Sequence, residues 1–132
     1  MSDPVKVYTI IALFSLPTVM FGGFSLLRLF KAGALNEFQA QYFRAGHAHA
    51  GVLLVLALVV LDIMDRIDLA TGSKWVIGAL FVVGVLAQSG GMFVHMAIGQ
   101  PGRWSRGNTL TVAGAVLLAV ALIWVAICTI LS

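Results

Sequence analysis

The feature that most constrains this chain is the distribution of its charges. Four long stretches carry no charged side chain: those between Lys6 and Arg28, between Arg44 and Asp62, between Lys74 and Arg103, and from Gly107 onward. Each is long enough, or nearly so, to cross ~30 Å of hydrocarbon as a helix. The composition, 61% hydrophobic and 10% charged, lies far from that of a soluble domain. We therefore predict an all-α integral membrane protein, a four-helix transmembrane bundle.

Turn signals place the helices at about residues 5–30, 42–63, 74–98 and 107–131, which together form a single transmembrane domain. Pro17 predicts a kink in the first helix because proline lacks a backbone N–H. The first apolar segment, residues 7–27, exceeds the roughly 7–15 residues of a signal-peptide core, so we expect a retained helix. The turn "TGSK" separates the second and third helices, and "GQPGR" ends the third.

An alternating topology puts the ends of the first and third helices and the starts of the second and fourth on one side, called side B. Side B carries five Lys or Arg residues and the opposite side A carries three. The positive-inside rule then predicts that side B is cytoplasmic and that both termini are external, in what we expect to be a bacterial plasma membrane. All three histidines of the chain fall on side B.

Histidine is rare in segments as apolar as "YFRAGHAHAGVL". His47 and His49 are two residues apart, so they project about 200° from each other on a helix and cannot both reach one ion. His95, near the end of the third helix, could face either of them. We take His49 and His95 as the preferred ligand pair because His49 is the deeper of the two histidines on the second helix.

Small residues surround these histidines and predict either close helix packing or space for a large flat group. Two facing imidazoles would suit haem b, with Arg28, Arg44 and Arg103 near its propionates. A copper ion is the alternative, held by His49, His95 and the thioethers of Met92 and Met96. Met92, His95 and Met96 share one helical face by their spacing.

Simpler interpretations exist for every one of these residues. The small side chains could only pack helices together, and the histidines could bond water, lipid phosphate or a carbonyl oxygen. The methionines could fill space, and the arginines could anchor the helices at the headgroups. Gln88 and Ser89 are expected to bond across helices.

The segment "HAHAGVLLVLALVV" resembles the histidine-bearing helix of haem–copper oxidase subunit I and of small NnrS-like membrane proteins. In those proteins a histidine near a helix start ligates low-spin haem. "GQPGR" also resembles the oxidase loop whose arginines hold haem propionates, although Gly102 stands at the first arginine position and only Arg103 matches. The resemblance, over about twenty residues, implies a haem ligand at His47 or His49 and a propionate partner at Arg103. It implies no oxidase activity, because the further histidines of a copper centre are missing.

Three functions therefore stay open. The first is a small haem-binding or copper-binding membrane protein for electron transfer, cofactor handling or redox sensing. The second is a non-catalytic subunit of a larger membrane complex, and the third is a channel or transporter protomer, which would need a homo-oligomer to form a pore. No catalytic residues are predicted, and an independent catalytic activity is not expected. The expected surroundings are the lipid bilayer rather than a nucleic acid, because the net charge of +3 is spread over the membrane-flanking loops.

Overall fold

The computed structural model describes all 132 residues and consists of four helices. They are α1 (Asp3–Lys31), α2 (Glu37–Arg66), α3 (Thr71–Ile98) and α4 (Arg106–Leu131). All four are long and apolar enough to span a membrane. The chain is therefore an all-α four-helix bundle of the integral membrane class, as its charge distribution predicts.

The second helix begins five residues before the expected position 42, and the cause is local. Asn36 caps α2 by accepting a hydrogen bond from the backbone N–H of Gln39 at 2.9 Å, and the Gln39 side chain accepts from the Asn36 N–H at 3.1 Å. This capping box satisfies two donors that a helix start leaves free. As a result, the polar segment before the histidines belongs to the helix rather than to the loop.

The connections on side B use glycine where the backbone turns left-handed. Gly33 has φ 63° just after α1 ends, and Gly102 has φ 70° in the turn before α4. Glycine adopts these angles without the steric cost that a Cβ adds. The expected kink at Pro17 does not interrupt the element, since α1 runs as one helix from Asp3 to Lys31.

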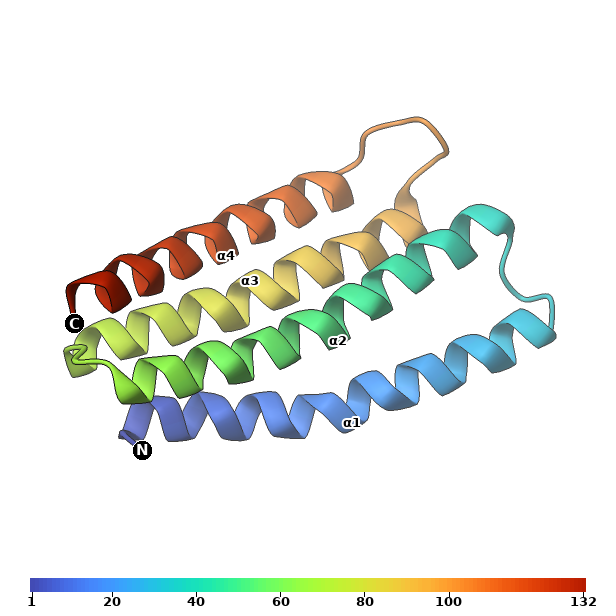
Figure 1. Ribbon diagram of the computed structural model, residues 1–132. Helices are drawn as coiled ribbons and strands as arrows, with labels where there is room; N and C mark the ends of the chain where they lie inside the picture. The colour runs from blue at the N-terminus through green and yellow to red at the C-terminus, as the bar shows by residue number, and fades with distance from the viewer.

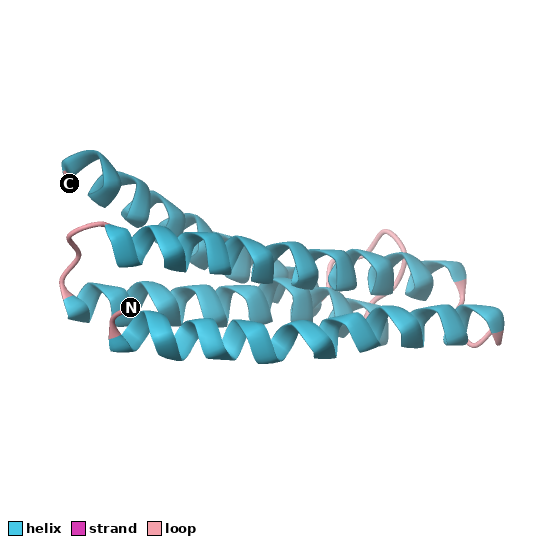
Figure 2. Ribbon diagram, turned by 60° about the horizontal axis from the view of Figure 1, so that its bottom comes forward, coloured by secondary structure: helices cyan, strands magenta, loops and turns pink.

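The helices run antiparallel, with both chain termini at one end (Figure 1). That end, with the α2/α3 turn, is side A; the α1/α2 and α3/α4 connections form side B (Figures 1 and 2). The predicted hairpin topology is therefore confirmed. α2 and α3 form the middle of the bundle, α1 packs on α2 and reaches α3, and α4 packs mainly on α3. α1 and α4 do not touch.

The tightest interface joins α3 to α4 through four glycines. A Cβ on Gly91 would overlap Thr111 and the Gly107 carbonyl oxygen, and one on Gly114 would overlap the backbone of Gln88. Gly84 faces Leu118 in the same way. These helix backbones approach closely because no side chain separates them, which is how membrane helices gain dispersion contacts.

The positions of charges and aromatic rings define the membrane frame. On α2, Arg44 and Asp62 are separated by about 27 Å of helix, close to the ~30 Å hydrocarbon thickness. At side A the rings of Tyr8 and Trp75 stack edge to face at 5.5 Å, and the Tyr8 hydroxyl donates to the Trp75 carbonyl oxygen at 3.0 Å. This pair is typical of an aromatic belt at a membrane interface.

Candidate functional site

His95 lies at the junction of α2, α3 and α4 near side B. The residue is 2% exposed, and its ring meets the ring of Tyr42 at 4.4 Å and that of Phe38 at 5.3 Å, both edge to face. Its Nδ1 is hydrogen-bonded to Ser105 Oγ at 2.7 Å. Ser105 is the N-cap of α4, so His95 ties the start of α4 to the end of α3.

His47 lies between α2 and α1. Its imidazole packs against Gly22 and Gly23, and a Cβ on Gly23 would come within 2.8 Å of His47 Nε2. The two glycines of α1 therefore make room for this imidazole. The packing interpretation of small residues applies here, since the space they leave is filled by a side chain of the same protein.

His49 is half-buried on a different face of α2. Its Nδ1 lies 2.8 Å from the carbonyl oxygen of Ala45, one turn earlier. A carbonyl oxygen can only accept, so Nδ1 carries the proton in this hydrogen bond and the neutral ring keeps its lone pair on Nε2. Of the three histidines, His49 is the one in which a hydrogen bond to a carbonyl oxygen determines that Nε2 is the unprotonated nitrogen.

The expected ligand pair, His49 and His95, is offset along the bundle. Tyr42 is level with His95, since their rings touch, and His49 follows Tyr42 by seven residues, about 10 Å of helix. The ring of His95 is moreover enclosed by two aromatic rings and bonded to Ser105. A shared ligand between these two histidines would need rearrangement of α2 against α3.

The methionines of the copper alternative, Met92 and Met96, are both half-buried on α3. The structure contains no group of three or more His, Cys, Asp or Glu side chains that could hold a metal ion. On α3, His95 is the one His, Cys, Asp or Glu residue that shares a helix face with Met92 and Met96.

The arginines of side B are all exposed. Arg28 lies over the ring of Phe24 at 5.9 Å and Arg44 over that of Phe30 at 6.0 Å, both within cation–π range. Arg103 donates to the Gln100 side chain at 3.1 Å inside the α3/α4 connection. Their positions suit headgroup anchors and leave the guanidinium groups accessible to an anionic ligand.

The other small residues near the histidines mostly pack against neighbouring helices. Gly46 lies on the ring of Phe93 and the Ser89 carbonyl oxygen of α3, and Gly51 lies against Val19 of α1. Gly90 is the exception, because a Cβ added there would meet nothing within 4 Å. The expected cross-helix bond of Ser89 is wrong, because its hydroxyl donates within α3 to the Val85 carbonyl oxygen at 2.6 Å.

Sequence reasoning does not find two residues of this region. Ser105 and Asn108 form a second capping box at the start of α4, and Ser105 also binds His95. The spacing of serine and a polar residue three positions later is the available signal. The contact with His95 has no local signal, since ten residues and a turn separate it from Ser105.

Comparison of the chain with protein-family models, curated proteins and solved structures finds no match. The likeness of the α2 segment to haem-binding helices therefore stays a prediction. The structure and the hydropathy of its helices establish the class, a small four-span integral membrane protein.

Proposed function

We propose that this protein binds haem in the membrane through His49, for electron transfer, cofactor handling or redox sensing. The observation that carries the proposal is the hydrogen bond from His49 Nδ1 to the Ala45 carbonyl oxygen. Metal-bound histidines usually donate their second ring N–H in this way, which orients the ring and raises its basicity. Imidazole is also a common axial ligand of haem iron.

The location of His49 supports the same proposal. It lies five residues, about 7 Å of helix, inside Arg44 and therefore within the hydrocarbon region near side B. An ionisable side chain at that depth is costly and is a functional candidate by default. Arg44, Arg28 and Arg103 stand at the adjacent interface, where they could pair with the propionates of a haem.

The proposed ligand is His49 alone, in place of the expected pair His49 and His95. His49 is the primary ligand, while His95 and His47 have structural surroundings that account for them: the cap of α4 for His95 and the glycines of α1 for His47. Copper bound with the help of Met92 or Met96 is the second cofactor to be tested, because thioether sulfur favours Cu(I).

The test is an absorption spectrum of detergent-purified protein expressed with haem available, oxidised and dithionite-reduced, with metal analysis of the same sample. We expect a Soret band that is lost in His49→Gly and restored by added imidazole, which can replace the missing ring. The matched control, His95→Ala, should keep the band. A band lost equally in His95→Ala and insensitive to imidazole in His49→Gly would contradict the assignment to His49.

A colourless protein without iron or copper would remove the haem proposal altogether. An accessory role in a larger membrane complex would then be the better interpretation. One structural feature favours that second candidate: the outer faces of α1 and α4 carry exposed apolar side chains, such as Phe14 and Ile123, which other membrane helices could cover. Co-purification of a stoichiometric membrane partner in mild detergent would support it.

A further inference from the structure

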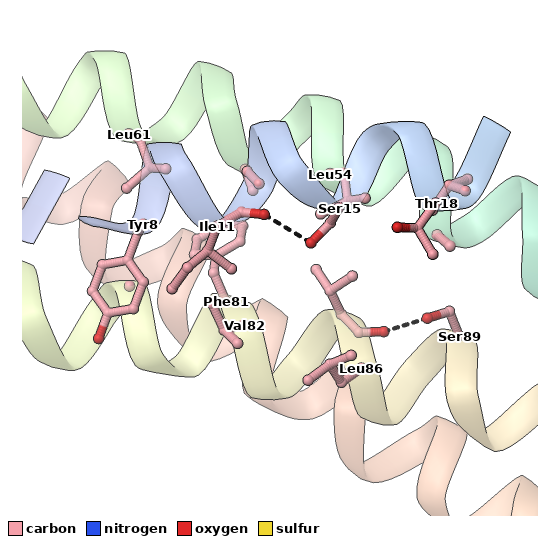
Figure 3. Close-up of a pocket in the computed structure, with 16 residues that line it drawn as sticks. Tyr8, Ile11, Ser15, Thr18, Leu54, Leu61, Phe81, Val82, Leu86 and Ser89 are labelled. Atoms are coloured by element: carbon pink, nitrogen blue, oxygen red, sulfur yellow. Dashed lines mark hydrogen bonds between the residues drawn. The ribbon is translucent and has the colours of Figure 1, made fainter. Parts of the chain in front are cut away.

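A cavity of about 270 Å³ lies between α1, α2 and α3, and none of the three histidines lines it (Figure 3). Most of its lining is apolar, and its residues recur every three or four positions on each helix, as Leu54, Ala57 and Leu61 do on α2. Lining residues with this spacing form a stripe along a helix. The cavity is therefore a groove that runs parallel to the helix axes and hence along the membrane normal.

The length and depth of the groove match one leaflet. On α1 it extends from Tyr8 to Val19, which is about 16 Å of helix, close to half of the ~30 Å hydrocarbon thickness. Its side A end is closed by the Tyr8 ring, which lies directly on Gly78 and belongs to the aromatic belt with Trp75. The groove thus begins at the headgroup boundary of side A and ends near the midplane.

The groove opens sideways into the bilayer. Three of its four lining residues on α2 are buried and form the floor: Leu54, Ala57 and Leu61. Ile11 on α1 and Leu86 on α3 are 41% and 67% exposed and form the two rims. Because the mouth lies between α1 and α3 at hydrocarbon depth, the molecules that meet it are lipid tails.

Three of the four hydroxyl groups that line the groove are bonded to backbone carbonyl oxygens, and the fourth belongs to Thr18, an exposed residue. The Ser15 hydroxyl donates to the Ile11 carbonyl oxygen at 2.7 Å, and that of Ser89 donates to Val85 at 2.6 Å (Figure 3). The Tyr8 hydroxyl donates a hydrogen bond to the carbonyl oxygen of Trp75. Hydroxyl groups bonded to backbone carbonyls can be buried against hydrocarbon without leaving a donor unsatisfied.

We propose that this groove binds one acyl chain of a phospholipid from the side A leaflet, with the headgroup beside Tyr8 and Trp75. The acyl chain fills the space between α1 and α3. It thereby completes the packing of α1 against α3, because α1 makes far fewer direct contacts with α3 than α2 makes with α3. Shape, depth, orientation and apolar lining all fit a hydrocarbon tail aligned with its neighbours in the bilayer.

The test uses the full chain in phosphatidylcholine nanodiscs that contain a phosphatidylcholine with a photoactivatable diazirine in one acyl chain. After irradiation, peptide mass spectrometry locates the labels. We expect labels on the buried residues Leu54 and Phe81, with a probe near the ester shifting them toward Leu61 and a probe at the chain end shifting them toward Val19. Labels confined to outward residues such as Phe14 and Val116 would overturn the proposal.

Variants that fill the groove test the proposal further, with a substitution on the outside of α4 as the matched control. Ala57→Leu, on the floor, should reduce labelling of Leu54 and Phe81 at least fivefold, and Ala50→Leu tests the same point nearer the midplane if Ala57→Leu fails to fold. Ala119→Leu, on the exposed face of α4, should leave the labelling unchanged. Labelling of Leu54 and Phe81 that persists in a folded groove-filling variant would also overturn the proposal.

Discussion

At the scale of single residues, the three histidines differ in their surroundings although they share one side of the membrane. His95 is enclosed by aromatic rings and binds the cap of α4, His47 fills the space above two glycines, and His49 bonds a carbonyl oxygen of its own helix. The carbonyl partner of His49 can only accept, so it fixes which ring nitrogen keeps its lone pair, whereas the Ser105 hydroxyl bonded to His95 can donate or accept. The same residue type thus serves packing in two places and, in the proposed haem site, would supply the ligand in the third.

The structural role of His95 predicts a coupling with Ser105. His95→Ala removes a buried hydrogen bond and a packed ring, so in cofactor-free protein we expect a loss of about 1–3 kcal/mol in the free energy of unfolding. Ser105→Ala should also destabilise, since it removes a helix cap. Thermal unfolding of both single variants and the double variant in detergent measures the coupling.

In that double-mutant cycle, we expect the two losses to be less than additive by about 1 kcal/mol, because each single variant already breaks the shared bond. The control pair is His95→Ala with Thr129→Ala, a substitution near the far end of α4 whose hydroxyl bonds only its own helix. Strict additivity for His95 and Ser105 would show that the two side chains do not interact.

At the scale of elements, the helices are held by different kinds of contact. α3 and α4 approach through Gly84, Gly91, Gly107 and Gly114, whereas α1 depends on Tyr8, on the His47 contact and on the residues around the groove. Close backbone approach gives many dispersion contacts and leaves little room for movement. We therefore expect the α3/α4 hairpin to be the part of the bundle that is most resistant to unfolding.

Neighbouring glycines of α3 test this difference. Gly91→Ala places a Cβ where Thr111 and the Gly107 carbonyl oxygen lie, and overpacking of this kind costs about 1–3 kcal/mol. Gly90→Ala is the matched control, because nothing lies within 4 Å of its Cβ. We expect a thermal midpoint several degrees lower for Gly91→Ala and nearly unchanged for Gly90→Ala. Equal midpoints would contradict the packing of α4 on this face.

At the scale of the whole molecule, the even number of spans puts the two chain termini and the α2/α3 turn at one end (Figure 1). The other end carries the two longer connections, the histidines and the larger number of Lys and Arg residues. The fold decides which residues share a side. The charge bias predicts which side faces the cytoplasm.

Cysteine labelling in intact cells checks both statements. In a Cys128→Ala background, Asp68→Cys and Ser132→Cys on side A should react with a membrane-impermeant maleimide. Ala34→Cys and Gln100→Cys on side B should react only after permeabilisation. All four positions lie outside the hydrocarbon region, beyond or at the ends of the helices. A reversed pattern would refute the orientation alone, while different accessibility of the two side A positions would refute the four-span topology.

The sequence by itself determined the class, the number of helices and the side on which the histidines lie, because hydrocarbon excludes charge and thereby imposes span lengths. It also determined that His47 and His49 point apart, since this follows from helix geometry alone. The predicted start of α2 is wrong because a capping box extends the helix into a polar segment, although Asn36 and Gln39 carry the signal.

Only the tertiary structure decided what the histidines and glycines touch. His95 meets Tyr42 and Ser105, and Gly22 and Gly23 meet His47, through helix pairings that no local pattern specifies. The groove between α1, α2 and α3 likewise depends on residues from three separate segments. The physical reason is that hydropathy fixes how each helix sits in the bilayer, whereas the rotation and register of one helix against another follow from side-chain packing across the interface.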